Sequence, residues 1–148
     1  MSETAASSIM KPTTFQGLTL LGSSNAFLPM RPEDAKLERF PNPRGGDPRY
    51  SVTFHCTEFT SLCPITAAPD FGTLEIEYSP RLWCLESKSL KLYLGAFRET
   101  GAFWEALTNQ IALHLDEFLR PHWIIVTATM NVRGGIGMTC YVPLGDIA

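Results

Sequence analysis

Positive charge is scarce in this sequence. Its 148 residues include 12 lysines and arginines against 15 aspartates and glutamates, which gives a formal net charge of −3 and a pI near 5.6. No basic stripe of the kind that a phosphate backbone requires is visible. The sequence therefore predicts no direct contact with nucleic acid.

Long apolar runs are also missing. No run approaches the roughly 20 residues that cross a bilayer. Residues 1–11 are polar and lack the basic start and apolar stretch of a secretory signal. We therefore expect a cytoplasmic protein without a membrane partner, whose cysteines stay reduced.

Metal-binding and dinucleotide-binding motifs are lacking as well. The four cysteines, at positions 56, 63, 84 and 140, form no Cys-x-x-Cys pair, and the three histidines complete no ligand pattern by their spacing. The glycine-rich run 133–137 lies between two predicted strands instead of opening a helix. The sequence predicts no metal site, and a nicotinamide cofactor would have to bind without a Rossmann domain.

The composition fits one domain preceded by an arm. Apolar residues make up 45% of the chain, enough to fill a core. Residues 1–48, rich in Ser, Thr, Pro and Gly, predict an N-terminal arm that is disordered to about residue 15. Within it, residues 18–21 would dock on the body and residues 32–38 would form a short helix. Residues 49–148 predict the folded domain.

Alternating apolar and polar residues predict four strands. Residues 50–57 and 73–78 form a first pair, joined by a long loop from about 58 to 70, and residues 125–142 form a second pair around a Gly-Gly turn. A loop of that length between neighbouring strands commonly carries function.

Two helices are predicted between the strand pairs. Apolar residues at i, i+3, i+4 and i+7 predict a helix from an N-cap at Ser87 to Phe97, and a second helix runs from near Gly101 to Arg120. This order indicates an α+β fold of the ββααββ type, an antiparallel four-stranded sheet with two helices on one face. Because open sheet edges invite pairing with another subunit, we expect a homo-oligomer.

Cys63 and Asp70 are the candidates for chemistry in the predicted loop. Most free cysteines are small buried hydrophobes, but a thiolate attacks electrophilic carbon well once its pKa is lowered or a base is near. Asp70 is either a turn residue that caps its own backbone or a desolvated carboxyl that holds a proton near neutral pH. Because Asp70 ends the loop that begins near Cys63, the two side chains could face each other.

Charged residues outside the loop allow two interpretations each. Lys88 and Lys91 share a face of the first helix, where they are either solvated or hold an anion such as a cofactor phosphate. Arg133 is either a surface charge at a hairpin end or a third cation of that set. Glu105 is either a first-turn glutamate favoured by the helix dipole or a carboxylate that accepts two N–H bonds from a guanine-type ring.

Three motifs resemble a known family. Residues 86–93, Glu-Ser-Lys-Ser-Leu-Lys-Leu-Tyr, fit every position of the signature of the 7-cyano-7-deazaguanine reductases, nitrile reductases of queuosine biosynthesis. Residues 59–64, Phe-Thr-Ser-Leu-Cys-Pro, and residues 69–71, Pro-Asp-Phe, match the nucleophile loop of that family. The resemblance is to the short single-domain form and covers about residues 17–142.

The resemblance implies a tunnelling fold, shared with GTP cyclohydrolase I, whose subunits join their sheets into a barrel, such as stacked pentamers, with active sites at the interfaces. It implies reduction of the nitrile of 7-cyano-7-deazaguanine (preQ0) to 7-aminomethyl-7-deazaguanine (preQ1) with two NADPH and no metal. Cys63 would form a covalent thioimide and Asp70 would relay protons. The residues implied to bind the substrate are Leu85, Glu86, Ser87, Trp104 and Glu105. The residues implied to bind the NADPH phosphates are Lys88, Lys91 and Arg133.

Two departures from the family pattern lie near these residues. The loop reads Ala67-Ala68 where family members usually have Gly-Gln. Trp104 stands where they usually have the histidine that contacts the base, so it would stack on the base or reshape its pocket.

Two other hypotheses stay open beside the reductase. An amidine-forming relative would attack the same nitrile with Cys63 but transfer ammonia, and the Lys88–Lys91 pair argues against it. A non-catalytic tunnelling-fold protein would hold a purine or pterin, and the presence of Cys63 with Asp70 argues against that.

Overall fold

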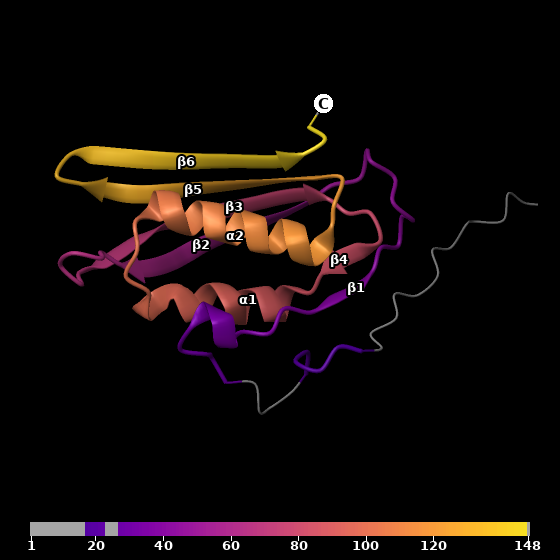
Figure 1. Cartoon of the computed structure of the whole chain (residues 1–148), viewed down its shortest axis with the longest axis horizontal. Coiled ribbons are helices and arrows are strands. Elements are labelled where there is room, and N and C mark those ends of the chain that lie inside the picture. Colours follow the sequence, from indigo (N-terminus) through magenta and orange to yellow (C-terminus); the bar gives the residue numbers. More distant parts are fainter. Residues whose placement is uncertain (1–16, 23–26, 148) are drawn as a thin grey trace, which may run out of the picture.

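The computed structural model describes residues 17–22 and 27–147. Their elements in chain order are η1 (Pro32–Asp34), β1 (Arg39–Pro41), β2 (Val52–Leu62), β3 (Pro69–Ser79), β4 (Trp83–Leu85), α1 (Ser87–Gly95), η2 (Ala96–Glu99), α2 (Trp104–Leu119), β5 (Trp123–Arg133) and β6 (Ile136–Gly145). Figure 1 shows their arrangement. No helix in these two described stretches is long and apolar enough to cross a membrane.

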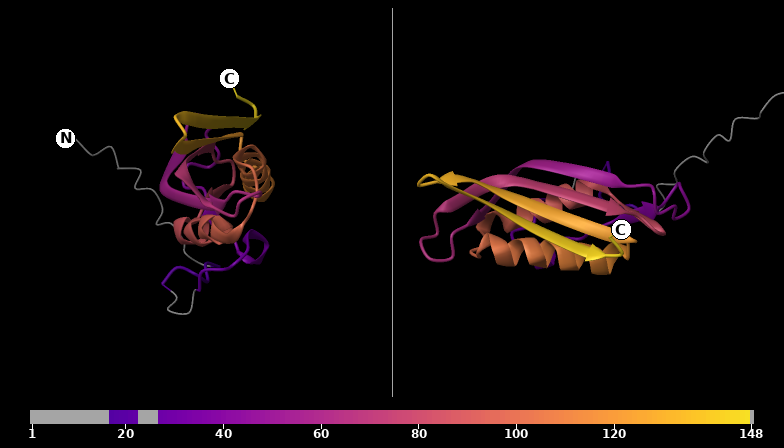
Figure 2. Two further views of the ribbon diagram at one scale, coloured as in Figure 1. Left: turned by 90° about the vertical axis from the view of Figure 1, so that its left-hand side faces the viewer. Right: turned by 90° about the horizontal axis from the view of Figure 1, so that it is seen from above.

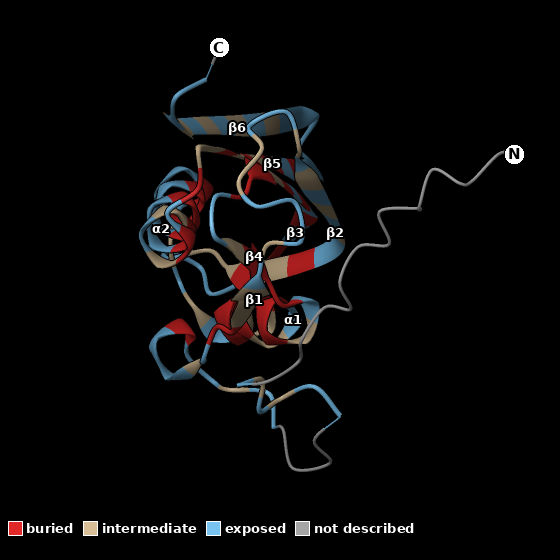
Figure 3. Cartoon of the chain, turned by 90° about the vertical axis from the view of Figure 1, so that its right-hand side faces the viewer, coloured by how far each residue is buried: buried red, intermediate tan, exposed pale blue. Residues whose placement is uncertain are grey.

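The four long strands form one antiparallel sheet in the order β2-β3-β5-β6, and α1 and α2 lie on the same face of it (Figures 1 and 2). Buried apolar residues of β3, β5 and both helices form the core between the layers. Figure 3 marks buried residues in red. The predicted α+β class, the ββααββ order of the main elements and the placement of both helices are confirmed.

β2 is longer than predicted because it contains a bulge. Up to Cys56 the even-numbered residues face the helices, whereas Phe59 and Ser61 occupy the inward side after the register shift between Cys56 and Phe59. One extra residue in a strand reverses the alternation of its side chains. The predicted strand end at residue 57 and the long loop over 58–70 were therefore wrong. Only residues 63–68 connect β2 to β3.

The N-cap of α1 is Glu86 and not, as predicted, Ser87. The Glu86 carboxylate accepts hydrogen bonds from the N–H groups of Lys88 and Ser89, each at 2.8 Å. Ser87 is the first helical residue, so its hydroxyl is past the position that caps a helix. The predicted apolar stripe of this region is buried, as expected; its members are Leu90, Tyr93, Leu94 and Phe97.

α2 begins at Trp104, three residues after its predicted start. Phe103, just before it, is 61% exposed. The end at Arg120 is as predicted: this residue has a left-handed backbone with φ of 49°, and its N–H donates to the carbonyl of Asp116 at 2.9 Å.

The segment before β2 is fixed to the body by β1 and Glu38. β1 pairs antiparallel with β4, and the main chain of Glu38 bonds to the N–H of Glu86 and to the hydroxyl of Ser89. The helix predicted at 32–38 is only the 3₁₀ turn η1, because the chain becomes extended at Ala35 and residues 36–38 lead into β1 without a helical turn.

The predicted docking of residues 18–21 is confirmed. The buried carboxylate of Glu38 accepts hydrogen bonds from the N–H groups of Thr19 and Leu20 and from the Thr19 hydroxyl. The disorder predicted for residues 1–15 lies outside the described residues.

Candidate active site

Cys63 lies at the tip of the β2–β3 hairpin, in a tight turn. Its N–H donates to the carbonyl of Ala68 at 2.8 Å, and its own carbonyl accepts from the N–H of Ala67 at 3.0 Å. Ala67 has a φ of 56°, in the left-handed region that residues other than glycine rarely adopt. Cys63 is half-buried and the residues that follow it in the turn are exposed, so a ligand can approach the thiol from solvent.

The turn itself lowers the pKa of Cys63. The Thr66 hydroxyl makes the largest contribution, followed by the N–H groups of Thr66 and Ile65, all as hydrogen-bond donors to the sulfur. Burial and the charge of Asp70 raise the pKa by a smaller amount. Because donors stabilise the thiolate, which is the nucleophilic form, the turn activates Cys63.

Asp70 is buried beside this turn, with 4% of its surface exposed. It lies opposite Ser61 in the β2–β3 pairing, so both side chains face the helices. Cys63 is the first residue after β2, and the charge of Asp70 acts on its thiol. Oδ1 of Asp70 accepts a hydrogen bond from Nη1 of Arg133. The structure thus brings Cys63, Asp70 and Arg133 together at one end of the sheet.

Trp104 supports this hairpin from the core. Its side chain is 1% exposed, its Nε1–H donates to the hydroxyl of Ser61 at 2.9 Å, and its ring meets Phe59 edge-on. A Cβ atom on Gly72 would overlap both this ring and the carbonyl of Thr129, so only glycine leaves room for the indole. Trp104 can therefore influence a ligand only through the strands that it supports.

Glu105 is exposed at the same end of the molecule. It lies in the first turn of α2, which begins beside the Cys63 turn because Gly101 forms a bridge with Leu62. Its carboxylate is accessible to a ligand that approaches this end.

Leu85, Glu86 and Ser87 lie at the opposite end, where α1 begins (Figure 1). They line a hollow of about 340 Å³. Its walls also include aromatic rings and two leucines of the docked N-terminal segment, namely Phe40, Tyr50, Phe54, Tyr78, Leu18 and Leu21. The carboxylate of Glu86 is committed to the cap of α1, which fixes its position at the edge of this hollow.

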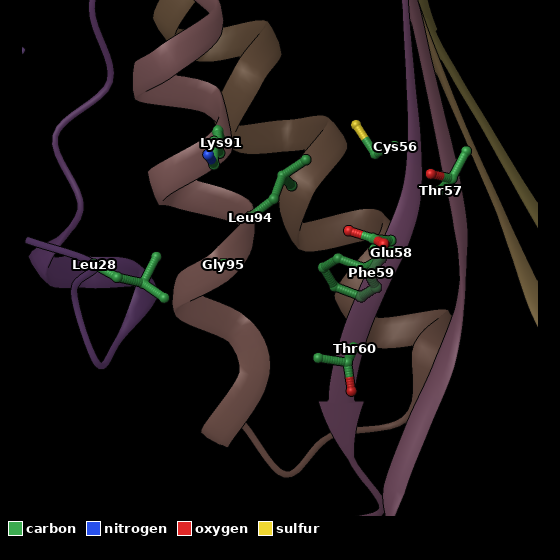
Figure 4. A pocket seen from close by; sticks show the side chains of 9 residues that line it. All are labelled: Leu28, Cys56, Thr57, Glu58, Phe59, Thr60, Lys91, Leu94 and Gly95. Carbon is green, nitrogen blue, oxygen red and sulfur yellow. The ribbon is translucent and has the colours of Figure 1, made fainter. Parts of the chain in front are cut away.

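Lys91 lines a second hollow, of about 410 Å³, between α1 and β2 (Figure 4). Leu94 beside it faces Cys56 and Phe59 of β2 across the space, and Leu28 closes one side. A lysine beside apolar walls suits a ligand that has both a ring and a negative charge. Lys88, three residues earlier on α1, is half-buried.

The predicted site residues therefore form two groups within one chain. The first, which we call the thiol group, comprises Cys63, Asp70, Trp104, Glu105 and Arg133. The second, which we call the helix group, comprises Leu85, Glu86, Ser87, Lys88 and Lys91. Val52 and Phe54, at the start of β2, line the hollow beside Glu86, whereas the end of β2 leads into Cys63. At about 3.3 Å per residue, the strand holds these two points roughly 30 Å apart.

Two supporting residues of the thiol group were not predicted from the sequence. Thr66 was overlooked, although a threonine three residues after a cysteine in a Cys-Pro turn is placed to bond locally. Ser61 was overlooked because the bulge in β2 hides its inward position. Neither residue is of a type that by itself indicates catalysis.

Comparison with known proteins gives a consistent assignment. The model of the family described as QueF-like protein matches residues 69–147. The NADPH-dependent 7-cyano-7-deazaguanine reductase of Brucella anthropi is 48% identical over 133 residues, covering 90% of this chain and 84% of that protein. The enzyme of the same name from Maricaulis maris is 47% identical over 137 residues, covering 93% and 88%.

A solved structure shares the fold. The archaeosine synthase QueF-Like in its apo form superimposes with a TM-score of 0.61 at 21% identity, covering 66% of this chain and 96% of that one. The predicted tunnelling fold of the subunit is thereby confirmed, whereas its assembly into a barrel stays a prediction.

Proposed function

Because the chain belongs to the 7-cyano-7-deazaguanine reductase family, we propose that it reduces the nitrile of 7-cyano-7-deazaguanine to the amine of 7-aminomethyl-7-deazaguanine with NADPH, a step of queuosine biosynthesis. The observation that carries this proposal is a cysteine with a lowered pKa beside a buried carboxyl, Cys63 with Asp70. A nitrile carbon is an electrophile that a thiolate attacks.

The thiol group would perform the covalent and proton chemistry. Sγ of Cys63 forms a bond to the nitrile carbon while the nitrile nitrogen takes a proton from Asp70, which gives a thioimide. The hydrogen bonds from Thr66 and Ile65 hold the sulfur as a thiolate before the attack and stabilise it again when it leaves.

The helix group offers a suitable place for NADPH. Two lysines three residues apart, beside a largely apolar hollow, fit phosphate groups and a flat ring, so Lys88 and Lys91 would hold the cofactor. Bound there, NADPH would supply hydride, and two hydrides together with two protons convert a nitrile to an amine.

The base would be held by carboxylates and by the hollow at the start of α1. A volume of about 340 Å³ with aromatic walls suits a bicyclic ring, and Leu85, Glu86 and Ser87 are at its edge. Glu105 would accept hydrogen bonds from the N–H edge of the base, because an ionised carboxylate is acceptor-only.

One chain alone cannot assemble this site, since Leu85, Glu86 and Ser87 lie beside the start of β2 and Cys63 follows its end. We propose that the thiol group of one copy meets the helix group of another in a homo-oligomer. The two outer strands of the sheet, β2 and β6, each have one edge without a partner strand among the described residues, which leaves them available for such contacts.

The test is to mix the protein with the nitrile base and NADPH, and to follow nicotinamide absorbance and the mass of the protein. We expect NADPH oxidation, and an adduct on Cys63 when NADPH is omitted. Cys63→Ala should abolish both signals.

Two results would contradict the proposal. A stable adduct without NADPH oxidation would favour an amidine-forming activity. The absence of both an adduct and oxidation would favour a protein that binds a purine or pterin without turnover.

A further inference from the structure

The hollow beside Glu86 is lined in part by the N-terminal segment. Residues 85–87 contribute to it from the start of α1, and Leu18 and Leu21 contribute from the segment. Residues 18–21 form neither a helix nor a strand, so their position depends on their contacts with the body of the domain. The contacts that hold this segment therefore shape the hollow.

The side chain of Glu38, which is 3% exposed, holds the segment in place. Its two oxygens accept hydrogen bonds from the N–H of Thr19 at 2.9 and 3.0 Å, and Oε2 also accepts from the N–H of Leu20 at 3.3 Å. The Thr19 hydroxyl donates to Oε1, and the ammonium of Lys36 lies 3.4 Å from the same oxygen. Undocking of the segment would break these charge-assisted bonds together. The carboxylate thereby keeps the two leucines of the segment at the hollow.

The main chain of Glu38 holds the start of α1. Its carbonyl accepts a hydrogen bond from the N–H of Glu86 at 2.9 Å, and its N–H donates to the hydroxyl of Ser89 at 3.0 Å. The N–H of Ser89 donates in turn to Oε2 of Glu86 at 2.8 Å. One residue thus fixes two parts of the wall of the hollow, the start of α1 through its main chain and the N-terminal segment through its side chain.

We infer that Glu38 is a positioning residue for the base. Its carboxylate docks residues 18–21, so that Leu18 and Leu21 pack on the ring that residues 85–87 hold at its edge. The base and the docked segment stabilise each other, because the base gains its contacts with the two leucines only while the segment is docked. The inference rests on the proposed function, since that function places the base in this hollow.

Binding is measured in a Cys63→Ala background, in which the nitrile base binds without forming an adduct. Glu38→Gln should raise the Kd of 7-cyano-7-deazaguanine about tenfold, the factor expected when the segment is docked about a tenth of the time. Glutamine accepts through one oxygen only, whereas the main-chain bonds to Glu86 and Ser89 stay. Glu33→Gln is the matched control: it changes an exposed glutamate of η1 and should leave the Kd unchanged.

Thr19→Val is a milder change at an exposed residue. It removes the hydroxyl that donates to Glu38 and keeps the N–H donors, so the Kd should rise by less than in Glu38→Gln. If Glu38→Gln does not fold, Thr19→Val decides, and an unchanged Kd would overturn the inference.

Turnover separates positioning of the base from a general loss of stability. With Cys63 intact, Glu38→Gln and Thr19→Val should raise the KM for the base and leave kcat at saturating base within about twofold, because neither change touches the reacting atoms. A lowered kcat with an unchanged KM for the base would overturn the positioning role.

Hydrogen exchange at the amides of Thr19 and Leu20 reports on docking directly, since both donate to Glu38. The base should slow this exchange in the Cys63→Ala protein, and the protection should be smaller once Glu38→Gln is added. A base that binds equally well with and without Glu38→Gln, and leaves the exchange unchanged, would overturn this inference alone. Absence of base binding in every variant, the Glu33→Gln control included, would contradict the proposed function and the inference with it.

Discussion

Cys63 depends on the residues of its own turn for its nucleophilic character. The donors to its sulfur are Ile65 and Thr66, two and three residues downstream, so the activation is local to one hairpin end. The sequence motif singled out Cys63 and Asp70 as candidates for nucleophile and acid, because they stand in a recognisable pattern. It did not identify Thr66, because a hydroxyl that bonds to a neighbouring residue is common in any turn.

Thr66→Val should raise the pKa of Cys63, because it removes the hydroxyl that contributes most to the lowered value. The alkylation rate by iodoacetamide should fall at pH 7, and its rise with pH should shift to higher pH. Thr66→Ser keeps the hydroxyl and serves as the control. An unchanged pH profile in Thr66→Val would show that the backbone N–H groups alone set this pKa.

Ala67→Gly should stabilise the protein. Ala67 adopts φ of 56°, a conformation that glycine adopts without the steric cost of a Cβ atom. We expect a gain of about 0.5–1 kcal/mol in the free energy of unfolding, after subtraction of the greater freedom of glycine in the unfolded chain. Urea unfolding measures this gain. Ala68→Gly, at a position without positive φ, should give no gain, and equal gains at both positions would contradict the explanation.

At the scale of elements, the sequence predicted the part of β2 before its bulge but not the part after it. Alternation identified the strand up to Cys56, and the reversed alternation after Phe59 resembled a loop. The short pair β1–β4 was missed because strands of three residues have no measurable period. The two helices were found because their apolar stripes are long and regular.

The N-terminal segment around Thr19 and Leu20 is held by hydrogen bonds to the carboxylate of Glu38. Burial by itself would raise the pKa of Glu38, but hydrogen bonds from Thr19 and Leu20, together with Lys36, lower that pKa below its usual value. Such a carboxylate stabilises the fold above its unfolded-state pKa, and this contribution is lost as the pH falls through the folded-state pKa. We therefore expect the docking of residues 18–21, which line the hollow beside Glu86, to weaken as the pH falls through the folded-state pKa of Glu38.

Glu38→Gln should consequently be less stable than the wild type at neutral pH, and the difference should shrink as the pH falls below about 5. Urea unfolding at a series of pH values measures it. Asp34→Asn, a first-turn change in η1, serves as a comparison without a buried ionic bond. A constant difference between Glu38→Gln and wild type across this range would exclude the carboxylate charge as the cause.

At the scale of the whole molecule, closeness in sequence was a poor guide to closeness in space. Cys63 and Glu86 are 23 positions apart, yet β2 and β3 place them at opposite ends of the sheet. Arg133 and Asp70 are far apart in sequence and in contact. The periodicity of apolar residues predicts which helices and strands exist. Which of their residues lie close together in space depends on strand lengths and on register.

Subunit mixing tests the two-copy site. Cys63→Ala and the double variant Lys88→Ala/Lys91→Ala should each be impaired alone, because each lacks one group. After subunit exchange in equal amounts, roughly a quarter of the sites should combine an intact thiol group with an intact helix group. NADPH oxidation measures the recovery.

The control for this mixing is the pair Cys63→Ala and Asp70→Asn. Both changes lie in the thiol group, so no combination of copies restores a complete site. Absence of recovery in the first mixture, once exchange has been verified by mass, would mean that both groups of a site come from one chain.

The low burial of β6 predicts that this strand opens before the rest of the sheet. None of its ten residues is buried, and its inward side chains are half-covered, although it forms half of the hairpin that carries Arg133 (Figure 3). Amide protons on β6 should therefore exchange with solvent earlier than those of β3 and β5, through a local opening that leaves the core intact. Association of copies along β6 would slow that exchange, so the lifetime of the contact on Asp70 becomes a function of protein concentration.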